Sequence, residues 1–301
     1  MPRLVVLLPA YNAASTLQAA LDSTLRALPR DAGVMVLDDG SSDGTARLAE
    51  SLADPRIRVH SRPNGGVASA LNEMLGLTDS EFVARMDADD LVLPGRFRRQ
   101  MSALSEGSDA VFTTVVQWGN GFSGLPRPSS IAAEDFGFHL LLTNPVAHST
   151  MLARRAAIER VGGYRELPTE DYDLWLRMAT SGARLRRLAV PGLAYRVHPD
   201  QITASPQWRR ASWQDPRIAA AYAELARTIL GVEAQRITSL SVDDSLDVEG
   251  KRRRFSRFCA LFEQALASRT PPVRRALRRR LAERSQWLDR RLLEATLQEA
   301  K

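Results

Sequence analysis

The front of the chain alternates short apolar runs with segments in which apolar residues recur at helical spacing. The apolar runs predict buried strands and lie at 4–8, 34–37, 57–59 and 82–86. Between them, the three- and four-residue spacing of a helix face recurs, first between Leu17 and Leu28. Asp43 and Pro94 predict the starts of two later helices. This alternation predicts an α/β fold with a mostly parallel sheet flanked by helices on both faces.

From residue 110 the alternation becomes irregular. Strands are predicted at 110–116, 150–153, 185–190 and 193–197. Helices are predicted at 136–142 and 171–181, with a Gly/Pro-rich loop at 119–128. Beyond Pro206 the pattern is helical only, interrupted by an acidic segment and by Pro271-Pro272. We therefore expect an α/β domain over residues 1–205 and a C-terminal helical extension over residues 206–301.

The formal net charge of +6 is unevenly distributed. Residues 207–301 carry 20 basic and 12 acidic side chains, whereas residues 1–206 carry 21 basic and 23 acidic ones. The extension is therefore the part expected to attract anionic lipid, nucleic acid or an acidic partner. A single cysteine, Cys259, excludes an internal disulfide and fits a reducing cytoplasm. The first apolar run is too short to span a bilayer.

Polar residues follow the predicted strands at the positions where ligands bind in open parallel sheets, beyond the carboxyl ends. These stretches are Pro9-Ala10-Tyr11-Asn12, Asp38 to Thr45, Asn64-Gly65-Gly66 and Met86-Asp87-Ala88-Asp89-Asp90. The aspartates at 87, 89 and 90 repel one another unless a cation neutralises them, and oxygen ligands suit Mn²⁺ or Mg²⁺. Helix capping is the alternative, credible for Asp90 alone. Of Asp38 and Asp39, we expect one to be structural and the other to accept hydrogen bonds from a nucleotide.

Several motifs in this order resemble bacterial family 2 glycosyltransferases of the GT-A fold. They are PAYN, LDDGSSDGT, NGGVASALN, ARMDADD with LPGRFRRQ, GGYRELPTEDYDLWLRMA and YRVHPDQIT. The resemblance covers about residues 3–203 and leaves out the helical extension. It implies a Rossmann-like catalytic domain and an inverting, metal-dependent transfer of a sugar from a nucleotide-sugar donor to an acceptor hydroxyl. The expected setting is the synthesis of bacterial cell-surface polysaccharide or glycoconjugate.

The resemblance also implies roles for individual residues. Tyr11 and Asp39 would contact the nucleoside, with Asp39 taking the base; Asp87 would approach the ribose. Asp89 would ligate the metal on the diphosphate. The remaining donor-pocket positions are Pro9, Asn64, Gly66 and Ala88. One departure is visible, because many family members have arginine where this chain has Leu71.

The second half of the motif set implies the residues that act on the acceptor. Asp171 corresponds to the base that removes the acceptor proton, whereas the charge of Glu170 is explained by the positive end of a helix dipole. His198 is either a metal or pyrophosphate contact or a structural histidine. His148 is expected to be a hydrogen-bonded structural residue, with a place on the acceptor side as the alternative. Trp175 is expected in the core.

The sequence leaves two alternative functions open. A sugar nucleotidyltransferase also binds a nucleotide and Mg²⁺ over a sheet, but it would need a glycine-rich, basic loop in place of PAYN. A non-catalytic nucleic-acid or membrane binding protein would use the arginine-rich tail. That tail lacks the interleaved aromatic residues of single-strand binding, so we expect no nucleic-acid partner. A UDP-sugar is the favoured donor, with GDP- and dTDP-sugars as alternatives; glycan, lipid-linked and protein acceptors stay open.

A stripe of leucines on one face of a predicted helix in the tail must be buried against another surface. Its members are Leu277, Leu281, Leu288 and Leu292, and eight arginines surround them. We expect the stripe to pack on the catalytic domain or on a second copy of the chain, forming a homodimer. The alternative is an interfacial helix that holds the enzyme peripherally at an anionic membrane, on its inner, cytoplasmic face.

Overall fold

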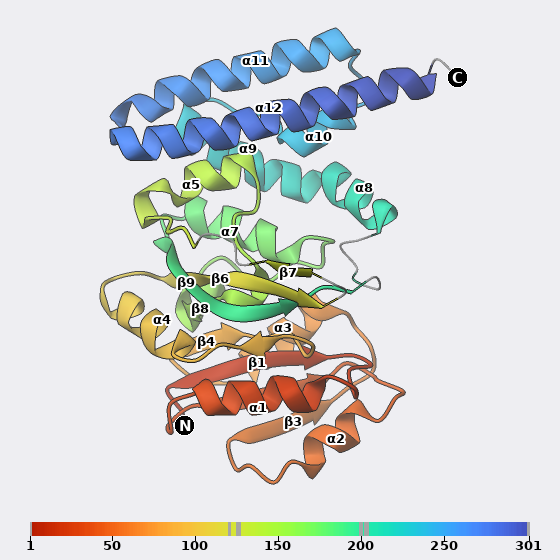
Figure 1. Cartoon of the computed structure of the whole chain (residues 1–301), viewed down its shortest axis with the longest axis vertical. Helices are drawn as coiled ribbons and strands as arrows, with labels where there is room; N and C mark the ends of the chain where they lie inside the picture. Colours follow the sequence, from red (N-terminus) through yellow and green to blue (C-terminus); the bar gives the residue numbers. More distant parts are fainter. Residues whose placement is uncertain (1, 120–121, 125–127, 199–200, 202–204, 300–301) are drawn as a thin grey trace.

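The computed structural model describes residues 2–119, 122–124, 128–198, 201 and 205–299. One mixed sheet runs through the lower half of the molecule in the order β3-β2-β1-β4-β8-β6-β9-β5, with β7 paired to β6 (Figure 1). The strands are β1 Leu4–Ala10, β2 Gly33–Asp38, β3 Ile57–Ser61, β4 Phe82–Arg85, β5 Leu91–Val92, β6 Ala110–Gly119, β7 Phe122–Gly124, β8 Leu152–Arg154 and β9 Leu185–Arg196.

The sheet is parallel where the sequence alternates regularly and mixed where it does not. Strands β1 to β4 are all parallel to their neighbours within this group. Strand β8 then lies antiparallel to both β4 and β6, while β6 and β9 are parallel. The predicted parallel sheet is therefore accurate for the first half, and the second half adds antiparallel pairs.

The two strands predicted at 185–190 and 193–197 form one strand, β9. Pro191 lies inside it, opposite register shifts in β6 at Phe112, Thr114 and Val115. Proline lacks the N–H that a regular ladder needs, and a bulge accommodates it. The loop predicted at 119–128 contains β7, and the rest of that prediction lies largely outside the described residues.

Alternation along the strands gives the sheet two apolar faces, and helices cover both. Val5 and Leu7 face one core, while Leu4, Val6 and Leu8 face the other. Helices α1 (Leu17–Ala27) and α4 (Arg96–Ser105) cover the second face; α3 (Val67–Gly76), α5 (Ala133–Leu142) and α7 (Glu170–Thr180) cover the first. Shorter helices are α2 Thr45–Ser51, the 3₁₀ turn η1 His148–Thr150 and α6 Arg155–Glu159.

Of two local predictions, one is corrected and one is confirmed. The N-cap of α2 is Gly44, not Asp43, although Asp43 still accepts a hydrogen bond from the Thr45 amide at 3.0 Å. A left-handed φ of +91° at residue 44 suits glycine, which explains the one-residue difference. Trp175 is fully buried, as predicted.

The C-terminal extension is helical, as predicted, and packs on the first core. Its helices are α8 Pro206–Gln214, α9 Pro216–Leu230, α10 Ile237–Ser241, α11 Val248–Ala265, the 3₁₀ turn η3 Leu266–Ser268 and α12 Pro271–Glu299. Helices α11 and α12 lie together at the top of Figure 1, farthest from α2. The leucine stripe of α12 is buried in the same cluster as residues of α5 and α7. Among the described residues, none of the helices combines the length and the apolar composition that crossing a bilayer requires.

Candidate functional site

The loops after β1 and β2 are bonded to each other at the carboxyl edge of the sheet. The amide of Asn12 donates to Ser41 Oγ at 2.8 Å, and the Ser42 amide donates to Asn12 Oδ1 at 2.9 Å. Asn12 has a φ of +49°, an uncommon value for a residue with a side chain. Its neighbour Tyr11 is 57% exposed, and Pro9, the residue before the last of β1, lies opposite Leu37 of β2. The structure therefore leaves the Tyr11 ring open to a ligand at this edge.

Asp39 lies at the centre of a second group of loop contacts. Its carboxylate accepts hydrogen bonds from Arg62 Nε at 2.7 Å, the Gly65 amide at 3.0 Å and the Gly66 amide at 2.8 Å. Asn64 Nδ2 donates to the Asp39 carbonyl at 2.9 Å. The predicted residues Asp39, Asn64 and Gly66 are thus brought together. Arg62 was missed, because a single arginine after a strand has no distinguishing sequence signal.

Asp38 points elsewhere. It is buried at the end of β2, where Oδ2 accepts the Ser41 amide at 3.3 Å. Oδ1 is buried without a hydrogen-bond partner among the described residues. Both aspartates therefore have structural partners, and Asp39 is the one whose contacts define the loop wall.

The carboxylates that follow β4 point in three directions. Asp87 Oδ1 is 2.5 Å from Arg85 Nη2. Asp90 is almost fully buried and accepts hydrogen bonds from the Arg196 amide at 2.8 Å and Ser149 Oγ at 3.0 Å. Asp90 thus holds β9 and η1 together, a structural role other than the helix capping considered for it, because the N-cap of α4 is Gly95. Ala88 is buried between Asp87 and Asp89, each of which is about one-third exposed.

Asp89 and His198, far apart in sequence, meet at this edge. His198 Nε2 lies 3.2 Å from Asp89 Oδ2, and each side chain is about one-third exposed. Burial and the nearby Asp87 raise the pKa of Asp89, and Arg196 Nε donates to the Asp89 carbonyl at 3.0 Å. No group of three or more His, Cys, Asp or Glu side chains gathers around a common point within the described ranges. Two protein ligands completed by substrate phosphates are the arrangement that this donor set fits.

Asp171 occupies the first turn of α7, where the helix dipole favours a carboxylate. Asn144 Nδ2 donates to Asp171 Oδ2 at 2.8 Å, and the Tyr172 amide donates to Oδ1 at 2.6 Å. Burial and the adjacent Glu170 raise the pKa of the Asp171 carboxyl group. A carboxyl with raised pKa at a helix start is suited to take up a proton.

The turn η1 contacts both the carboxylates that follow β4 and the carboxylates at the start of α7. His148 Nε2 lies 3.0 Å from the Tyr164 hydroxyl, and Nδ1 lies 3.4 Å from Glu170 Oε1. The next residue, Ser149, bonds to Asp90. Adjacent residues of one short turn thus contact the Asp89-Asp90 pair and the Glu170-Asp171 pair, so both pairs lie at the same end of the sheet. His148 has the structural partners expected of it.

Two buried arginines beneath this edge, Arg85 and Arg96, were not predicted. Arg96 is almost fully buried, and its Nη2 donates to the carbonyls of Arg85 and Met151 at 3.0 and 3.3 Å. Burial lowers the pKa of Arg96 to about 9, although Asp90 and Asp87 oppose the shift. Arg96 belongs to the LPGRFRRQ motif, which was the available signal. Leu71, the position of the family departure, is fully buried in the core and does not face the site.

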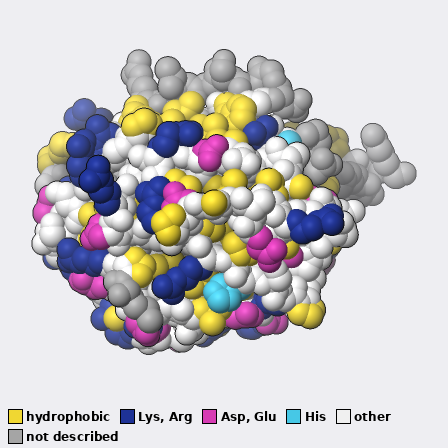
Figure 2. All heavy atoms as spheres, turned by 90° about the horizontal axis from the view of Figure 1, so that it is seen from below, with side chains coloured by type: hydrophobic (Ala, Val, Ile, Leu, Met, Phe, Trp, Pro, Cys, Tyr) yellow, Lys and Arg dark blue, Asp and Glu magenta, His cyan; other side chains and the backbone are white. Residues whose placement is uncertain are grey.

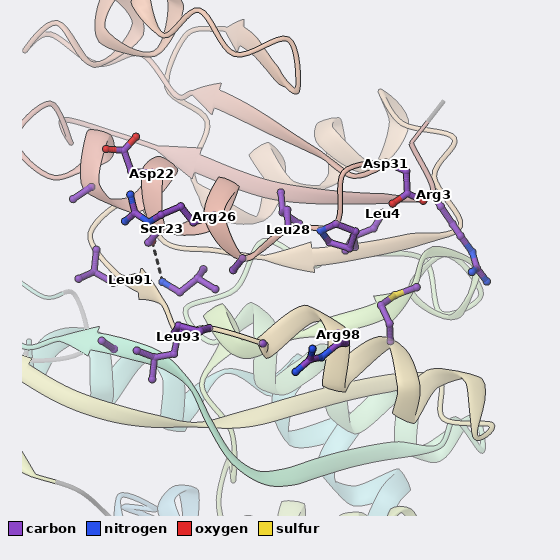
Figure 3. Close-up of a pocket in the computed structure, with 18 residues that line it drawn as sticks. Arg3, Leu4, Asp22, Ser23, Arg26, Leu28, Asp31, Leu91, Leu93 and Arg98 are labelled. Atoms are coloured by element: carbon purple, nitrogen blue, oxygen red, sulfur yellow. Dashed lines mark hydrogen bonds between the residues drawn. The ribbon is translucent and has the colours of Figure 1, made fainter.

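A spacious groove in the described part of the chain lies away from these residues. It has a volume of about 1180 Å³ and lies between α1, β5 and α4, with the Ser23 hydroxyl accepting the Val92 amide at its wall (Figure 3). Arg3, Arg26 and Arg98 lie at its rim, and its floor is apolar. No sequence-predicted site residue lines it, so groove size alone does not locate the chemistry.

Comparison with known proteins identifies the family. The family model for glycosyl transferase family 2 matches residues 5–162, just over half of the chain. The amylovoran biosynthesis glycosyltransferase AmsE of Erwinia amylovora is 28% identical over 211 residues, 67% of this chain and 79% of that protein. The match covers only 19% of some longer curated relatives.

Two solved structures share the fold. S. aureus TarS in complex with UDP-GlcNAc superposes with a TM-score of 0.61 at 16% identity, covering 98% of this chain and 92% of that one. The mannosyltransferase PcManGT of Pyrobaculum calidifontis, in complex with GDP-Man and Mn²⁺, has a TM-score of 0.54 at 21% identity, covering 98% and 86%. The GT-A expectation is thereby confirmed at the level of fold, and the chain belongs to glycosyl transferase family 2.

Proposed function

We propose that this glycosyltransferase binds a nucleotide-sugar at the carboxyl edge of β1, β2 and β4 and inverts the anomeric centre during transfer. The observation that carries the proposal is the placement of Asp89-His198 and Asn144-Asp171 on either side of η1. A metal–diphosphate site and a proton acceptor must lie on opposite sides of the anomeric carbon for an in-line displacement. The two pairs supply the two kinds of group that such a displacement needs, which supports the proposal.

In this proposal the donor lies across the first loops. Tyr11 packs on the nucleoside, and Asp39 presents its remaining acceptor capacity to the base, because three of its roughly four lone-pair sites are used by Arg62, Gly65 and Gly66. Asp87 approaches the ribose. The other contacts of the donor pocket come from Pro9, Asn64, Gly66 and Ala88.

Asp89 and His198 would hold Mn²⁺ or Mg²⁺, with donor phosphates as the other ligands. When bound, such a cation supplies charge stabilisation to the leaving diphosphate. The mixed oxygen and imidazole pair at 3.2 Å fits this better than it fits a closed structural site, which needs more protein ligands.

Asp171 would remove the proton of the acceptor hydroxyl as that oxygen attacks the anomeric carbon. Asn144 fixes the carboxylate through Oδ2, and the Tyr172 amide fixes it through Oδ1. Glu170 and His148 pair with each other, so the neighbouring charges are held in one arrangement. A positioned base of this kind contributes roughly 10²- to 10⁴-fold to the rate.

For substrates, we favour a UDP-sugar donor, because the TarS complex holds UDP-GlcNAc; the GDP-Man complex of PcManGT keeps GDP-sugars as the second choice, with dTDP-sugars third. The resemblance to AmsE favours an acceptor in bacterial polysaccharide synthesis. We also propose peripheral binding to the cytoplasmic face of an anionic membrane, supported by the basic extension and the exposed Leu293 and Leu297.

The rivals have less support. A nucleotidyltransferase would have no use for the Asn144-Asp171 pair. Figure 2, which looks from below Figure 1, shows basic, acidic and hydrophobic side chains interspersed on the face opposite α11 and α12, so the described side chains of that face form no single-sign basic surface.

The test is turnover of UDP-, GDP- and dTDP-sugars with Mn²⁺, together with calorimetric titration of the matching nucleoside diphosphate with and without EDTA. We expect release of nucleoside diphosphate with one donor class, and at least about tenfold weaker binding in EDTA or in Asp89→Asn, since charge-assisted contacts are lost. Asp31→Asn, an exposed aspartate at the distant groove, is the charge-matched control. Release of inorganic diphosphate from a sugar phosphate and a nucleoside triphosphate would instead identify a nucleotidyltransferase.

A further inference from the structure

A small basic pocket lies between the loop that joins α5 to η1, strand β9 and helix α12. Its volume is about 120 Å³, roughly that of four water molecules. Three arginines line it, Arg187 from β9 and Arg280 and Arg284 from α12, together with His139 and Asn144. No carboxylate is found among its described lining residues. The size suits a single tetrahedral oxyanion rather than a sugar ring.

The hydrogen bonds of these arginines leave most of their positive charge without a counterion. Arg187 donates to the Ser129 carbonyl at 3.0 Å, to Ser129 Oγ at 2.7 Å and to the Pro145 carbonyl at 2.6 Å, all of them neutral acceptors. These bonds fix the guanidinium and leave two of its five N–H groups. Arg187 is therefore a preorganised donor.

The two arginines of α12 differ in their partners. Arg280 pairs with Glu283 at 3.3 Å on the exposed side of the helix. Arg284 is half-buried and lies 5.8 Å from the Trp287 ring. Across the described residues it has neither a hydrogen bond nor an ion pair, which is costly for a half-buried guanidinium.

The titration behaviour of the pocket agrees with this excess of positive charge. Burial and Arg280 together lower the pKa of Arg187 to about 10 and also lower the pKa of Arg284. Burial, Arg187 and Arg280 lower the pKa of His139 to about 4, so this imidazole is neutral at pH 7. A bound anion would relieve all three shifts.

The pocket adjoins the proposed base. Asn144 lines it and also donates to Asp171 Oδ2 at 2.8 Å, while the next residue, Pro145, accepts from Arg187. One short loop thus contacts both Arg187 and the base. An anion on the acceptor would be held beside the group that removes the acceptor proton.

We propose that this pocket binds a phosphate group of the acceptor, and so positions the acceptor hydroxyl for Asp171. The acceptor class is then a phosphate-bearing sugar or a glycan on a phosphate-linked carrier. This inference rests on the proposed role of Asp171. Free inorganic phosphate has the same chemistry as the acceptor's phosphate, so the experiment separates the two.

The first arm locates phosphate binding without turnover. The full chain is labelled with phenylglyoxal in EDTA, with and without inorganic phosphate, and labelled arginines are quantified by peptide mass spectrometry. We expect phosphate to slow labelling of Arg280 and Arg284 at least fivefold and to leave Arg279, exposed on the same helix, unchanged within twofold. Equal protection of all three arginines, or of none, would overturn the site.

Calorimetry tests the same residues by substitution. The double variant Arg280→Gln/Arg284→Gln should weaken phosphate binding at least about tenfold, because two charge-assisted contacts are lost. Arg279→Gln is the matched control. Thermal unfolding checks that the variants are folded, and Arg280→Lys/Arg284→Lys, which keeps both charges, should retain most of the binding if the glutamine variant fails to fold.

The second arm decides whether the phosphate belongs to the acceptor. In a panel of sugars paired with their phosphate esters, the double variant should raise KM at least tenfold for phosphorylated acceptors only. An equal change for both members of each pair would overturn the acceptor assignment. Hydrolysis of the donor by the parent enzyme reports on the proposed function separately, so the two proposals can fail independently.

Discussion

At Asp171, burial and Glu170 raise the pKa of a carboxyl group that must be ionised to act as a base. We expect Asp171→Asn to reduce transfer by roughly 10²- to 10⁴-fold while nucleoside diphosphate binds with unchanged affinity, because the base contacts only the acceptor. Initial rates and calorimetry on the same preparation measure both. Asp173→Asn is a poor control because Asp173 pairs with Arg177 in the core; Glu166→Gln, exposed nearby, is a better one. Near-normal turnover of Asp171→Asn would remove the residue from the base role.

The raised pKa of Asp171 also predicts how the stability of the folded protein changes with pH. A carboxyl whose folded-state pKa exceeds its unfolded value stabilises the fold fully below the unfolded value, about 4, and that contribution is lost as the pH rises through the folded value. Asp171→Asn should therefore unfold at a higher temperature than the parent at pH 7 and lose this advantage near pH 4. The acid limb of kcat/KM in the parent should lie above the ordinary aspartate range for the same reason. A stability difference that grows toward acid pH would contradict both expectations.

Many family members have arginine where this chain has Leu71, and substitution at this position tests whether such an arginine could reach the donor. It is fully buried, so Leu71→Arg would place an unpaired charge in the core rather than a new contact on the donor. We expect a loss of several kcal/mol in the free energy of unfolding and no gain in nucleotide affinity. Leu71→Met, which roughly conserves volume, should cost less than about 1.5 kcal/mol. Urea titration of the three proteins measures the difference, and a folded Leu71→Arg that binds donor more tightly would show that the side chain reaches the site.

At the scale of elements, the regular first half was predictable and the bulged strand was not. Apolar runs and helical spacing were enough for β1 to β4, because β1, β2 and β4 are buried on both faces and each helix buries one stripe. The edge strand β3 is only partly buried, and its alternating Ile57 and Val59 supplied the signal. Strand β9 was predicted as two because Pro191 and Gly192 signal a turn, and only the pairing with β6 keeps the chain extended there. Long-range pairing of that kind leaves no local sequence signal.

The residues of the candidate site divide in the same way, into those predictable from local sequence and those whose roles depend on long-range packing. Asp39, Asn64 and Gly66 were predicted together because each follows a strand or opens a helix, and the structure brings them into direct contact. Arg62 and Arg284 were not singled out, since their roles depend on which distant residues pack against them. Asp90 was predictable as structural from its position, but its partners Arg196 and Ser149 come from elements that only the fold brings together.

Substitution of Gly192 in β9 tests how tightly the strand packs against β6 at the bulge. A Cβ at this position would lie 2.3 Å from Thr113 Oγ1 and 2.8 Å from Thr113 Cγ2. Gly192→Ala should therefore destabilise the protein by about 1–3 kcal/mol through overpacking. The cost should be smaller in a Thr113→Ala background, which removes both of those atoms. Gly182→Ala is not a matched control because its φ is positive, whereas Gly76→Ala, in open space at the end of α3, should be nearly neutral. Equal effects of Gly192→Ala in both backgrounds would contradict the steric explanation.

At the scale of the whole molecule, the extension and the catalytic part share one core. The four leucines of the α12 stripe are buried with residues of α5 and α7, and the Tyr222 hydroxyl donates to the Leu141 carbonyl at 2.8 Å. The expectation that the stripe packs on the catalytic domain is confirmed by this burial. The stripe is consequently not available for insertion into lipid, and any membrane contact must use other side chains of the tail.

The exposed end of α12 offers those side chains. Leu293 and Leu297 are 62% and 57% exposed, one helical turn apart, and the exposed Arg290 and Arg291 precede them. Apolar side chains beside basic ones favour binding to an anionic interface, where hydrophobic burial and charge attraction act together. We expect the full chain to co-sediment with phosphatidylglycerol vesicles at low salt and to be released as salt increases.

Substitution at these two leucines tests the surface without opening the core. Leu293→Ser/Leu297→Ser should lower vesicle binding at least about tenfold, since each leucine loses several buried methylene equivalents. Leu77→Ser, at the C-terminus of α3 and 42% exposed, is the matched control and should bind as the parent does. Neutral phosphatidylcholine vesicles should bind both proteins weakly. If the parent ignores anionic vesicles at low salt, or the double variant binds as well as Leu77→Ser, the membrane proposal is wrong and the arginines of α12 serve the chain's own packing and its phosphate pocket.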